Sequence, residues 1–546
     1  MANREKGLGV RTGILWDRLI SISDEVFKTV VRTSFSSAVR EGHDACCVLL
    51  DSKGRSIVQS TQNVPSFIGT LPMTMREVLA RFDLKDMEAG DVIGTNDPWF
   101  GTGHLYDLTV IRPVFFKGEL LCFTGTVNHL PDVGGSGYND TAKEMYEEGL
   151  NIPPSKLVEA GKPNSDIMSI IERNVRMNDK VLGDIQAVIS ANHLGERRLL
   201  ELLDDEKLGR EDFEELCQAI IRMTRSAMKK ELVKVQGSYR STIQAEALDS
   251  AVRIKCKVSI DSDKGVLIDY SGSSKAVDAA INVPYSYTYS WSSYAIKCVY
   301  APLIPNNEGI FELIKVVAPD NSVVNIKPPH AVAGRHVLGH YLPSVIFRAL
   351  AKASPDRVIA DSGMWTVMYF DGYNNLGSRY SVQYSSSGGL GARPNEDGIS
   401  CLSFPTDVSN IPVEAWEQVT DLLVEERKLR ENSEGAGKYR GGFGQVVTIK
   451  NITAKQVSVS VSCNRTLFAP QGLRGGLAGT RREFFFNGRP APGRGRYYLN
   501  PGDEVTLKDA GGGGYQNVRM RDKNLVRQDI NEGLITVNRA RQLYHS

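Results

Sequence analysis

The sequence lacks several features that would place it at once in a common class of protein. No stretch approaches the roughly 18 consecutive apolar residues of a membrane span, and the N-terminal text MANREKGLGVRTG has no apolar signal core. The 65 basic residues nearly balance the 64 acidic ones, giving a net charge of +1, and no long basic run is present. These absences disfavour membrane insertion, secretion and nucleic-acid binding. They predict a soluble, cytoplasmic protein.

The common nucleotide, hydrolase and redox motifs are missing as well. The chain has no G-x-x-x-x-G-K-[ST] loop, no G-x-G-x-x-G between a strand and a helix, and no G-x-S-x-G elbow. Its eight cysteines are scattered and form no C-x-x-C pair, which argues against a disulfide framework or a structural zinc knuckle. We therefore expect no ATP site on this chain and predict that most of the cysteines are buried thiols.

The length and the apolar patterns predict a multidomain α/β (mixed α+β) protein with a β-rich, glycine-rich C-terminal region. A chain of 546 residues is too long for one hydrophobic core, so we expect divisions at 1–236, 237–432 and 433–546. Glycine-rich text at 435–444, 472–479 and 510–515 predicts many tight turns in the last of these. Helices are expected around an apolar stripe at 15–30 and over 165–204, 211–235 and 342–352, and strands over 46–51, 57–58, 252–260 and 265–270.

The strongest chemical signal lies between residues 102 and 129. Two β-branched and aromatic runs, 109–116 and 119–127, flank Lys117-Gly118 and predict a β-hairpin. If Phe116 lies opposite Glu119, position 106 lies opposite position 129, so His104, Asp107 and His129 cluster at the open end. A one-residue slip reverses the face of a side chain, so a bulge or an irregular strand end is needed to aim all three inward. Two imidazoles and a carboxylate suit a catalytic divalent metal, although ordinary polar residues at a strand end would look the same.

Further polar residues surround this set in the sequence. Asp44 stands just before the strand at 46–51 and is the natural fourth ligand or general base, and Asp132 is a weaker candidate for that role. A metal held in this way could activate water or polarise a carbonyl or enolate oxygen. Arg335 is a candidate anion-binding residue. The polar segments at 174–176 and 183–187 could form either a border of the cavity or a solvated helix face. For His330, His336 and His340, structural or surface roles are favoured.

The motifs occur in an order that resembles the hydantoinase B family over nearly the whole chain. They are TNDP at 95–98, GHLYD at 103–107, His129 with DVGG at 132–135, EGL at 148–150 with PP at 153–154, GD and QA at 183–187, DYSGS at 269–273, IN at 281–282, PNNEG at 305–309, YRGG at 439–442 and the glycine run at 511–514. Around Asp44 and after the glycine run, at 515–518, the text departs from the family. These departures leave the expected metal ligands untouched.

This resemblance implies a function and a partner. The family includes B subunits of ATP-dependent N-methylhydantoinases, 5-oxoprolinases and caprolactamase, and the alpha subunit of acetone carboxylase. It implies manganese or zinc held by Asp44, His104, Asp107 and His129, and a separate hydantoinase A-type subunit that holds ATP and Mg. We therefore predict the metal-bearing B-type component of a hetero-oligomeric, ATP-dependent cyclic-amide hydrolase, with Asp44, His129 and Asp132 as candidate catalytic residues. A ketone carboxylase component and a non-catalytic scaffold are the alternatives.

Overall fold

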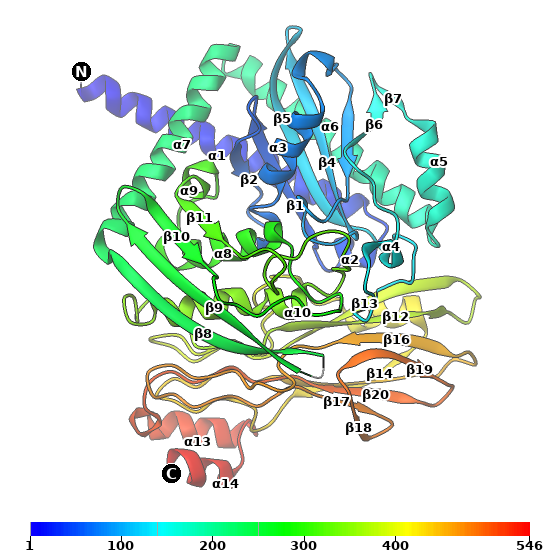
Figure 1. Cartoon of the computed structure of the whole chain (residues 1–546), viewed down its shortest axis with the longest axis vertical. Coiled ribbons are helices and arrows are strands. Elements are labelled where there is room, and N and C mark those ends of the chain that lie inside the picture. The colour runs from blue at the N-terminus through cyan, green and yellow to red at the C-terminus, as the bar shows by residue number, and fades with distance from the viewer. Residues whose placement is uncertain (1, 139, 249, 546) are drawn as a thin grey trace.

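The computed structural model describes residues 2–138, 140–248 and 250–545, with side chains from residue 10 onward. Figure 1 shows the N-terminal part at the top, the middle part at the left, and the C-terminal strands across the base. Helices and four separate sheets alternate along the chain, so the expected mixed α/β class with several structural units is confirmed. Among these described residues, no helix combines the length and the hydropathy that crossing a bilayer requires.

The first sheet has seven strands, all paired antiparallel. They are β1 Ala45–Asp51, β2 Ser56–Gln59, β3 Val92–Thr95, β4 Asp107–Phe116, β5 Glu119–His129, β6 Ser155–Glu159 and β7 Lys162–Pro163, in the order β2-β1-β5-β4-β3-β6-β7. Alternate side chains of β1 enter different cores: Leu49 packs toward the long helices, and Val48 and Leu50 pack toward residues 67–78. Because both faces are covered, the apolar text at 46–50 forms a strand without alternation, as predicted.

Long helices cover one face of this sheet. They are α1 Ala2–Thr33, α5 Ser165–Asn174, α6 Asn178–Asp205 and α7 Arg210–Leu232, while α3 Leu71–Arg81 covers the other face. In α1, Leu15, Leu19, Val26 and Val30 are buried, which confirms the predicted stripe. The helical pattern expected over 165–204 forms two helices and not one, because Val175 is extended and separates α5 from α6. The polar text at 174–176 is therefore a helix exit and not a continuous helical face.

The middle part wraps a four-stranded sheet around two buried helices. Its elements are β8 Gly237–Ala247, β9 Ser250–Asp261, β10 Gly265–Asp269, β11 Ile314–Val317, α8 Tyr285–Tyr300, α9 Glu308–Phe311, α10 His336–Gly339 and α11 Tyr341–Leu350. The sheet order is β11-β10-β9-β8, with only the β10/β11 pair parallel. The expected strand pair at 252–270 and helix at 342–352 are confirmed. The aromatic residues of α8, including Trp291, form the centre of this core.

Two further sheets pack face to face at the base of Figure 1. The first contains β12 Trp365–Tyr373, β13 Arg379–Ser387, β16 Val457–Ser462 and β19 Arg494–Leu499; the second contains β14 Leu423–Leu429, β15 Gln445–Lys450, β17 Glu483–Phe486, β18 Arg489–Ala491 and β20 Glu504–Lys508. Each sheet joins strands from both sides of residue 433. The division into three domains stays a prediction. Short helices complete the chain: α2 Ser37–Arg40, α4 Met145–Glu148, α12 Val413–Thr420, α13 Lys523–Asn531 and α14 Val537–Arg539.

The glycine-rich segments are not the tight turns that the sequence suggests. They run past one another as extended chains, and most of their glycines have no left-handed backbone angle. A methyl group on Gly389 would lie 1.8 Å from the carbonyl oxygen of Gly442, and one on Gly511 would lie 1.8 Å from that of Ser433. Glycine is needed here because backbone packs directly against backbone.

Candidate metal centre

The β4/β5 hairpin brings the three predicted ligands together. Asp107 begins β4, His129 ends β5, and the two residues are direct cross-strand partners. His104 lies in the turn just before β4. Its Nε2 is 2.9 Å from Asp107 Oδ2, and His129 Nδ1 is 2.9 Å from Asp107 Oδ1. One ligand atom from each of the three buried side chains falls within a cluster no wider than 4.8 Å.

The predicted pairing of position 106 with position 129 is wrong by one residue. Phe116 does pair with Glu119, but Leu121 is an extra residue on β5, so a bulge separates the pairs Phe115/Leu120 and Val114/Cys122. Beyond the bulge the register is shifted. Asp107 therefore replaces Tyr106 opposite His129, and the carboxylate and the imidazole share one face. The bulge is the irregularity that convergence of the three side chains was expected to need.

Asp44 approaches the same set from the neighbouring strand. It stands one residue before β1, and its carbonyl oxygen accepts a hydrogen bond from the backbone N–H of His129. Its carboxylate oxygen lies 4.0 Å from His129 Nδ1. Burial raises the pKa of Asp44 to about 6, against the opposing effect of His129. Asp44 thus lies beside the three clustered residues, and its carboxylate is farther from His129 Nδ1 than that of Asp107 is.

The electrostatics favour a neutral imidazole at His104 and an ionised Asp107. Burial, and then the nearby charge of Arg335, lower the pKa of His104 to about 3. Burial by itself raises the pKa of Asp107, but His104, His129 and Arg335 outweigh it and hold that pKa well below its usual value. Neutral imidazole and ionised carboxylate are the forms in which these side chains bind metal.

Arg335 is the main counter-charge of Asp107. Its Nη2 lies 3.1 Å from Asp107 Oδ2, its Nε donates to the Thr102 carbonyl oxygen at 2.6 Å, and its guanidinium stacks on Tyr287 at 4.3 Å. Gly103 permits this approach, because a methyl group there would lie 2.7 Å from the Arg335 side chain and its φ is +92°. The anion that Arg335 contacts within the protein is therefore the carboxylate of Asp107.

The polar atoms of the set fit a divalent cation. Both ring nitrogens of His104 are buried without a hydrogen-bond partner in the described part of the chain, although Nε2 lies so close to Asp107. His104 Nε2 and His129 Nδ1 both lie close to the Asp107 carboxylate, and the His104 contact does not have the geometry of a hydrogen bond. Two nitrogens and a carboxylate placed in this way are suited to share an ion. The other nitrogen of His129, Nε2, lies 3.5 Å from the Tyr369 hydroxyl, which matches the way metal-binding imidazoles are commonly oriented.

The set lines a small cavity of about 50 Å³. A second cavity of about 450 Å³ shares His129, Tyr369 and Gln383 with it and has Arg32, Arg40 and Lys180 among its lining. The small cavity can hold a few waters or the reacting end of a ligand, and the larger one can hold the remainder. The lining residues of the small cavity are Asp44, Val64, Ser66, Phe67, His104, Asp107, His129, Tyr138, Tyr287, Ala333, Arg335, His336, His340, Trp365, Val367, Tyr369, Gln383, Thr406 and Val408.

Several residues singled out in the sequence have other places in the structure. Asp132 does not line the cavity: its carboxylate accepts hydrogen bonds from the backbone N–H groups of Gly134 and Arg176 and from the Arg176 side chain. His336 and His340 do line it, whereas His330 forms an isolated bridge with Glu144, and the structural or surface roles favoured for these three histidines stay a prediction. Asp184, from the polar text at 183–187, accepts hydrogen bonds from the backbone that lines the larger cavity, at residues 35 and 36.

The far wall of the cavity could not be found from the sequence. It comes from β12 and β13, where Trp365, Val367 and Tyr369 alternate onto one face and Gln383 pairs with Tyr369. These residues lie more than 230 positions after His129. The only signal in the sequence is the alternation in WTVMY, and nothing local indicates what that face contacts.

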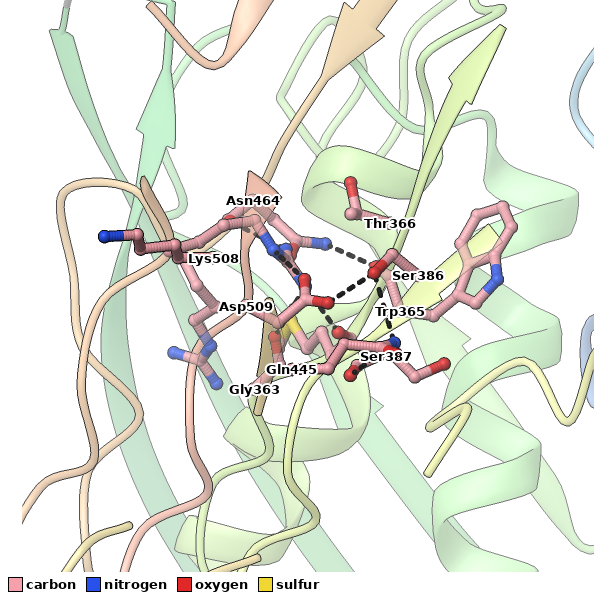
Figure 2. Close-up of polar contacts among 12 residues, drawn as sticks. Gly363, Trp365, Thr366, Ser386, Ser387, Gln445, Asn464, Lys508 and Asp509 are labelled. Atoms are coloured by element: carbon pink, nitrogen blue, oxygen red, sulfur yellow. Dashed lines mark hydrogen bonds and ion pairs between the residues drawn. The ribbon is translucent and has the colours of Figure 1, made fainter. Parts of the chain in front are cut away.

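A buried polar network anchors the start of β12. Figure 2 shows Asp509 at its centre, hydrogen-bonded to Ser386, with Asn464 beside it. Arg482 Nε donates to Asp509 Oδ1 at 2.8 Å, and both side chains are fully buried. Asn464 Nδ2 also donates to the Trp365 carbonyl oxygen at 3.3 Å. The network therefore fixes the backbone of Trp365, while the indole turns away from it (Figure 2).

The fold and the buried ligand set together define a candidate metalloprotein of mixed α/β architecture. A model of the Hydantoinase B/oxoprolinase family matches residues 9–518, and the chain belongs to this family. An uncharacterized protein of Methanocaldococcus jannaschii is 30% identical over 537 residues, covering 96% of this chain and 93% of that protein. The putative D-/L-hydantoinase B chain of a Pseudomonas species is 28% identical over 559 residues, covering 96% of this chain and 92% of that one.

Two solved structures are similar over nearly the whole chain. The ATP-dependent caprolactamase from Pseudomonas jessenii matches with a TM-score of 0.91 and 26% identity, covering 98% of this chain and 96% of that one. Acetone carboxylase in its nucleotide-free form matches with a TM-score of 0.88 and 19% identity, covering 98% of this chain and 79% of that one. The second likeness shows a shared fold alone. The expected family resemblance is confirmed by these comparisons.

Proposed function

We propose that this chain is the metal-bearing component of an ATP-dependent enzyme that opens cyclic amides. The observation that carries the proposal is the meeting of His104, Asp107 and His129 in one buried cavity. Similarity to a putative hydantoinase B chain and to an ATP-dependent caprolactamase supports it. Because the sequence has no nucleotide-binding motif, we further propose that ATP and Mg are held by a separate A-type subunit, and that the two chains form a cytoplasmic hetero-oligomer.

The proposed reaction divides the work between the two chains. An amide carbonyl is a poor electrophile, and its oxygen would be phosphorylated by ATP on the partner chain, which makes the carbonyl carbon electrophilic. Water then adds to that carbon, the ring C–N bond breaks with the nitrogen leaving as a protonated amine, and a second water hydrolyses the resulting acyl phosphate to carboxylate and phosphate. A divalent ion, manganese or zinc, held by His104, Asp107 and His129 would polarise the reacting group and lower the pKa of water from about 15.7 toward about 7. Geometry and availability decide between the two metals, because the same ligands bind several divalent ions.

The chain's own residues have distinct parts in this proposal. Asp44 accepts the proton of the attacking water, since a carboxyl group with a pKa of about 6 is ionised at neutral pH yet remains a useful base. Arg335 holds Asp107 in place, and Tyr369 orients the ring of His129. Asp132 takes no part in the chemistry, because its carboxylate is occupied by Gly134 and Arg176.

A pair of histidine variants tests the proposal. We expect His129→Ala to lose bound metal and ring-opening activity together, measured by elemental analysis and by ATP-dependent product formation in the complex with the partner chain. His193→Ala is the matched control, because His193 is an exposed histidine on α6 whose side chain pairs with Glu196. Activity retained by metal-free His129→Ala protein would remove this mechanism, and a wild-type chain without stoichiometric metal would favour the scaffold alternative.

The carboxylase alternative keeps one observation in its favour. Val64, Phe67, Val367 and Val408 give much of the small cavity an apolar lining, which would suit an apolar ketone. Labelled bicarbonate separates the two functions. Substrate-dependent incorporation of label into a stable product would support carboxylation, whereas a ring-opened product without label would support hydrolysis.

A further inference from the structure

Two buried hydrogen-bond donors on the cavity wall have no partner. Trp365 and Gln383 line the small cavity and are 7% and 4% exposed. Within the described ranges of the chain, neither the indole Nε1 of Trp365 nor the amide Nε2 of Gln383 makes a hydrogen bond. Buried polar groups of native proteins are nearly always paired, so unpaired donors in a cavity wall point to a ligand that accepts from them.

Both donors lie on the face that closes the cavity opposite the β4/β5 hairpin. Trp365, Val367 and Tyr369 alternate onto this face of β12, and Gln383 is the cross-strand partner of Tyr369 on β13. The Tyr369 hydroxyl lies 3.5 Å from His129 Nε2, which brings this face to the edge of the candidate metal set. A small ligand that reaches His129 is therefore within range of this wall.

The polar network below β12 does not use the Trp365 indole. That network engages the Trp365 carbonyl oxygen through Asn464, and Figure 2 shows the indole directed away from Asp509 and Ser386. The side-chain amide of Gln383 is also not used by its neighbour Trp416. The Trp416 indole donates to the backbone carbonyl oxygen of Gln383 and not to its side chain. The packing of the fold therefore leaves both donors available to a ligand.

We propose that Trp365 and Gln383 form a specificity subsite that donates hydrogen bonds to a second acceptor atom of a small cyclic substrate. This inference rests on the proposed function and names the substrate class more closely. The reacting carbonyl takes the metal side of the cavity, and a second carbonyl on the same ring takes the donor side. A ring with two carbonyl groups is then bound more tightly than a simple lactam of the same size, because the lactam leaves the donors of Trp365 and Gln383 unpaired.

A matched pair of ligands tests the subsite. Succinimide and 2-pyrrolidinone are both five-membered rings that are neutral at pH 7, with a ring N–H beside a first carbonyl in the same positions, and only succinimide has a second carbonyl. Calorimetric titration of the full-length chain in the presence of Mn²⁺ gives the ratio of the two dissociation constants. We expect succinimide to bind at least about fivefold more tightly, the effect of one additional neutral hydrogen bond.

Substitutions then assign the preference to its residues. Gln383→Met and Trp365→Phe each remove one donor and should lower the ratio, and the double variant should bring it close to one. Ser385→Ala is the matched control: Ser385 lies on β13 two residues from Gln383, with a buried and unpartnered hydroxyl among the described residues, but it does not line the cavity. Its ratio should equal that of the wild type.

The outcomes separate the subsite from the proposed function. Equal affinities in the wild type, no binding of either ligand, or a preference that survives in the double variant would overturn the subsite. A double variant that binds both ligands more weakly at an unchanged ratio would also count against it. Because the titration uses neither ATP nor turnover, a chain that prefers succinimide and yet opens no ring would refute the proposed function while keeping the subsite.

Discussion

Asp107→Asn should both remove the candidate metal site and destabilise the fold. The Asp107 carboxylate lies 2.9 Å from His104 Nε2, 2.9 Å from His129 Nδ1 and 3.1 Å from Arg335 Nη2, and it also accepts from the Thr102 hydroxyl. Asparagine keeps the shape of the side chain and removes its charge. We expect bound metal to be lost, since an amide is a far weaker ligand for a divalent ion than a carboxylate.

The cost to stability comes from Arg335. This residue is only 5% exposed, and Asp107→Asn leaves its guanidinium buried without a counter-ion. Breaking a buried ion pair from one side costs about 3–5 kcal/mol, whereas replacing both partners is often nearly neutral. At about 3 °C per kcal/mol for a large domain, the melting temperature of the metal-free protein should fall by roughly 10 °C. The double variant Asp107→Asn/Arg335→Met should recover most of this loss.

Thermal melts of the chelator-treated proteins measure the effect. Asp278→Asn is the matched control, because Asp278 pairs with Lys143 on the surface, where both side chains are more than half exposed. That substitution should change the melting temperature by no more than about 2 °C. The reasoning would be refuted if Asp107→Asn melted like the control, or if the double variant melted no higher than the single one.

Three further predictions address the surroundings of the site. Tyr369→Phe removes the hydroxyl 3.5 Å from His129 Nε2 and should weaken metal binding about tenfold in a competition titration, with little change in melting temperature. Burial raises the pKa of Glu148 to about 8, so between about pH 5 and 8 this carboxyl group is protonated in the folded state and ionised in the unfolded state. The free energy of unfolding should therefore fall as pH rises through this range. Glu148→Gln should flatten that slope in pH-dependent melts. Gly389→Ala should prevent accumulation of soluble protein, since its methyl group would collide with the Gly442 carbonyl oxygen. Gly13→Ala is the control: a methyl group at this position of α1 meets no atom within 4 Å, so the variant should melt at or slightly above the wild type.

The parts of the fold that the sequence predicts are those set by local pattern. The stripe on α1 and the two runs around Lys117-Gly118 have the periods of a helix and of a hairpin, and both elements form as expected. A hairpin also fixes which residues lie at its open end, so the nearness of His104, Asp107 and His129 followed from spacing alone. Asp44 joins them because β1 pairs with β5.

The remaining features depend on contacts that no local pattern encodes. The bulge at Leu121 decides that Asp107 and not Tyr106 faces His129, and an apolar strand gives no sign of where an extra residue will be accommodated. Trp365 and Gln383 reach the cavity only through the packing of one sheet on another. The glycine-rich text suggested turns because turns are the commoner use of glycine, while close backbone packing produces the same composition.

The central claim is that His104, Asp107 and His129 bind one divalent cation. Anomalous X-ray diffraction from crystals of the full-length chain grown with Mn²⁺ tests it most directly. We predict one strong peak among His104 Nε2, His129 Nδ1 and the Asp107 carboxylate, with Asp44 at its edge, and no such peak in His104→Ala crystals. Crystals in which that position carries no anomalous density, at a Mn²⁺ concentration that supports activity, would contradict the claim.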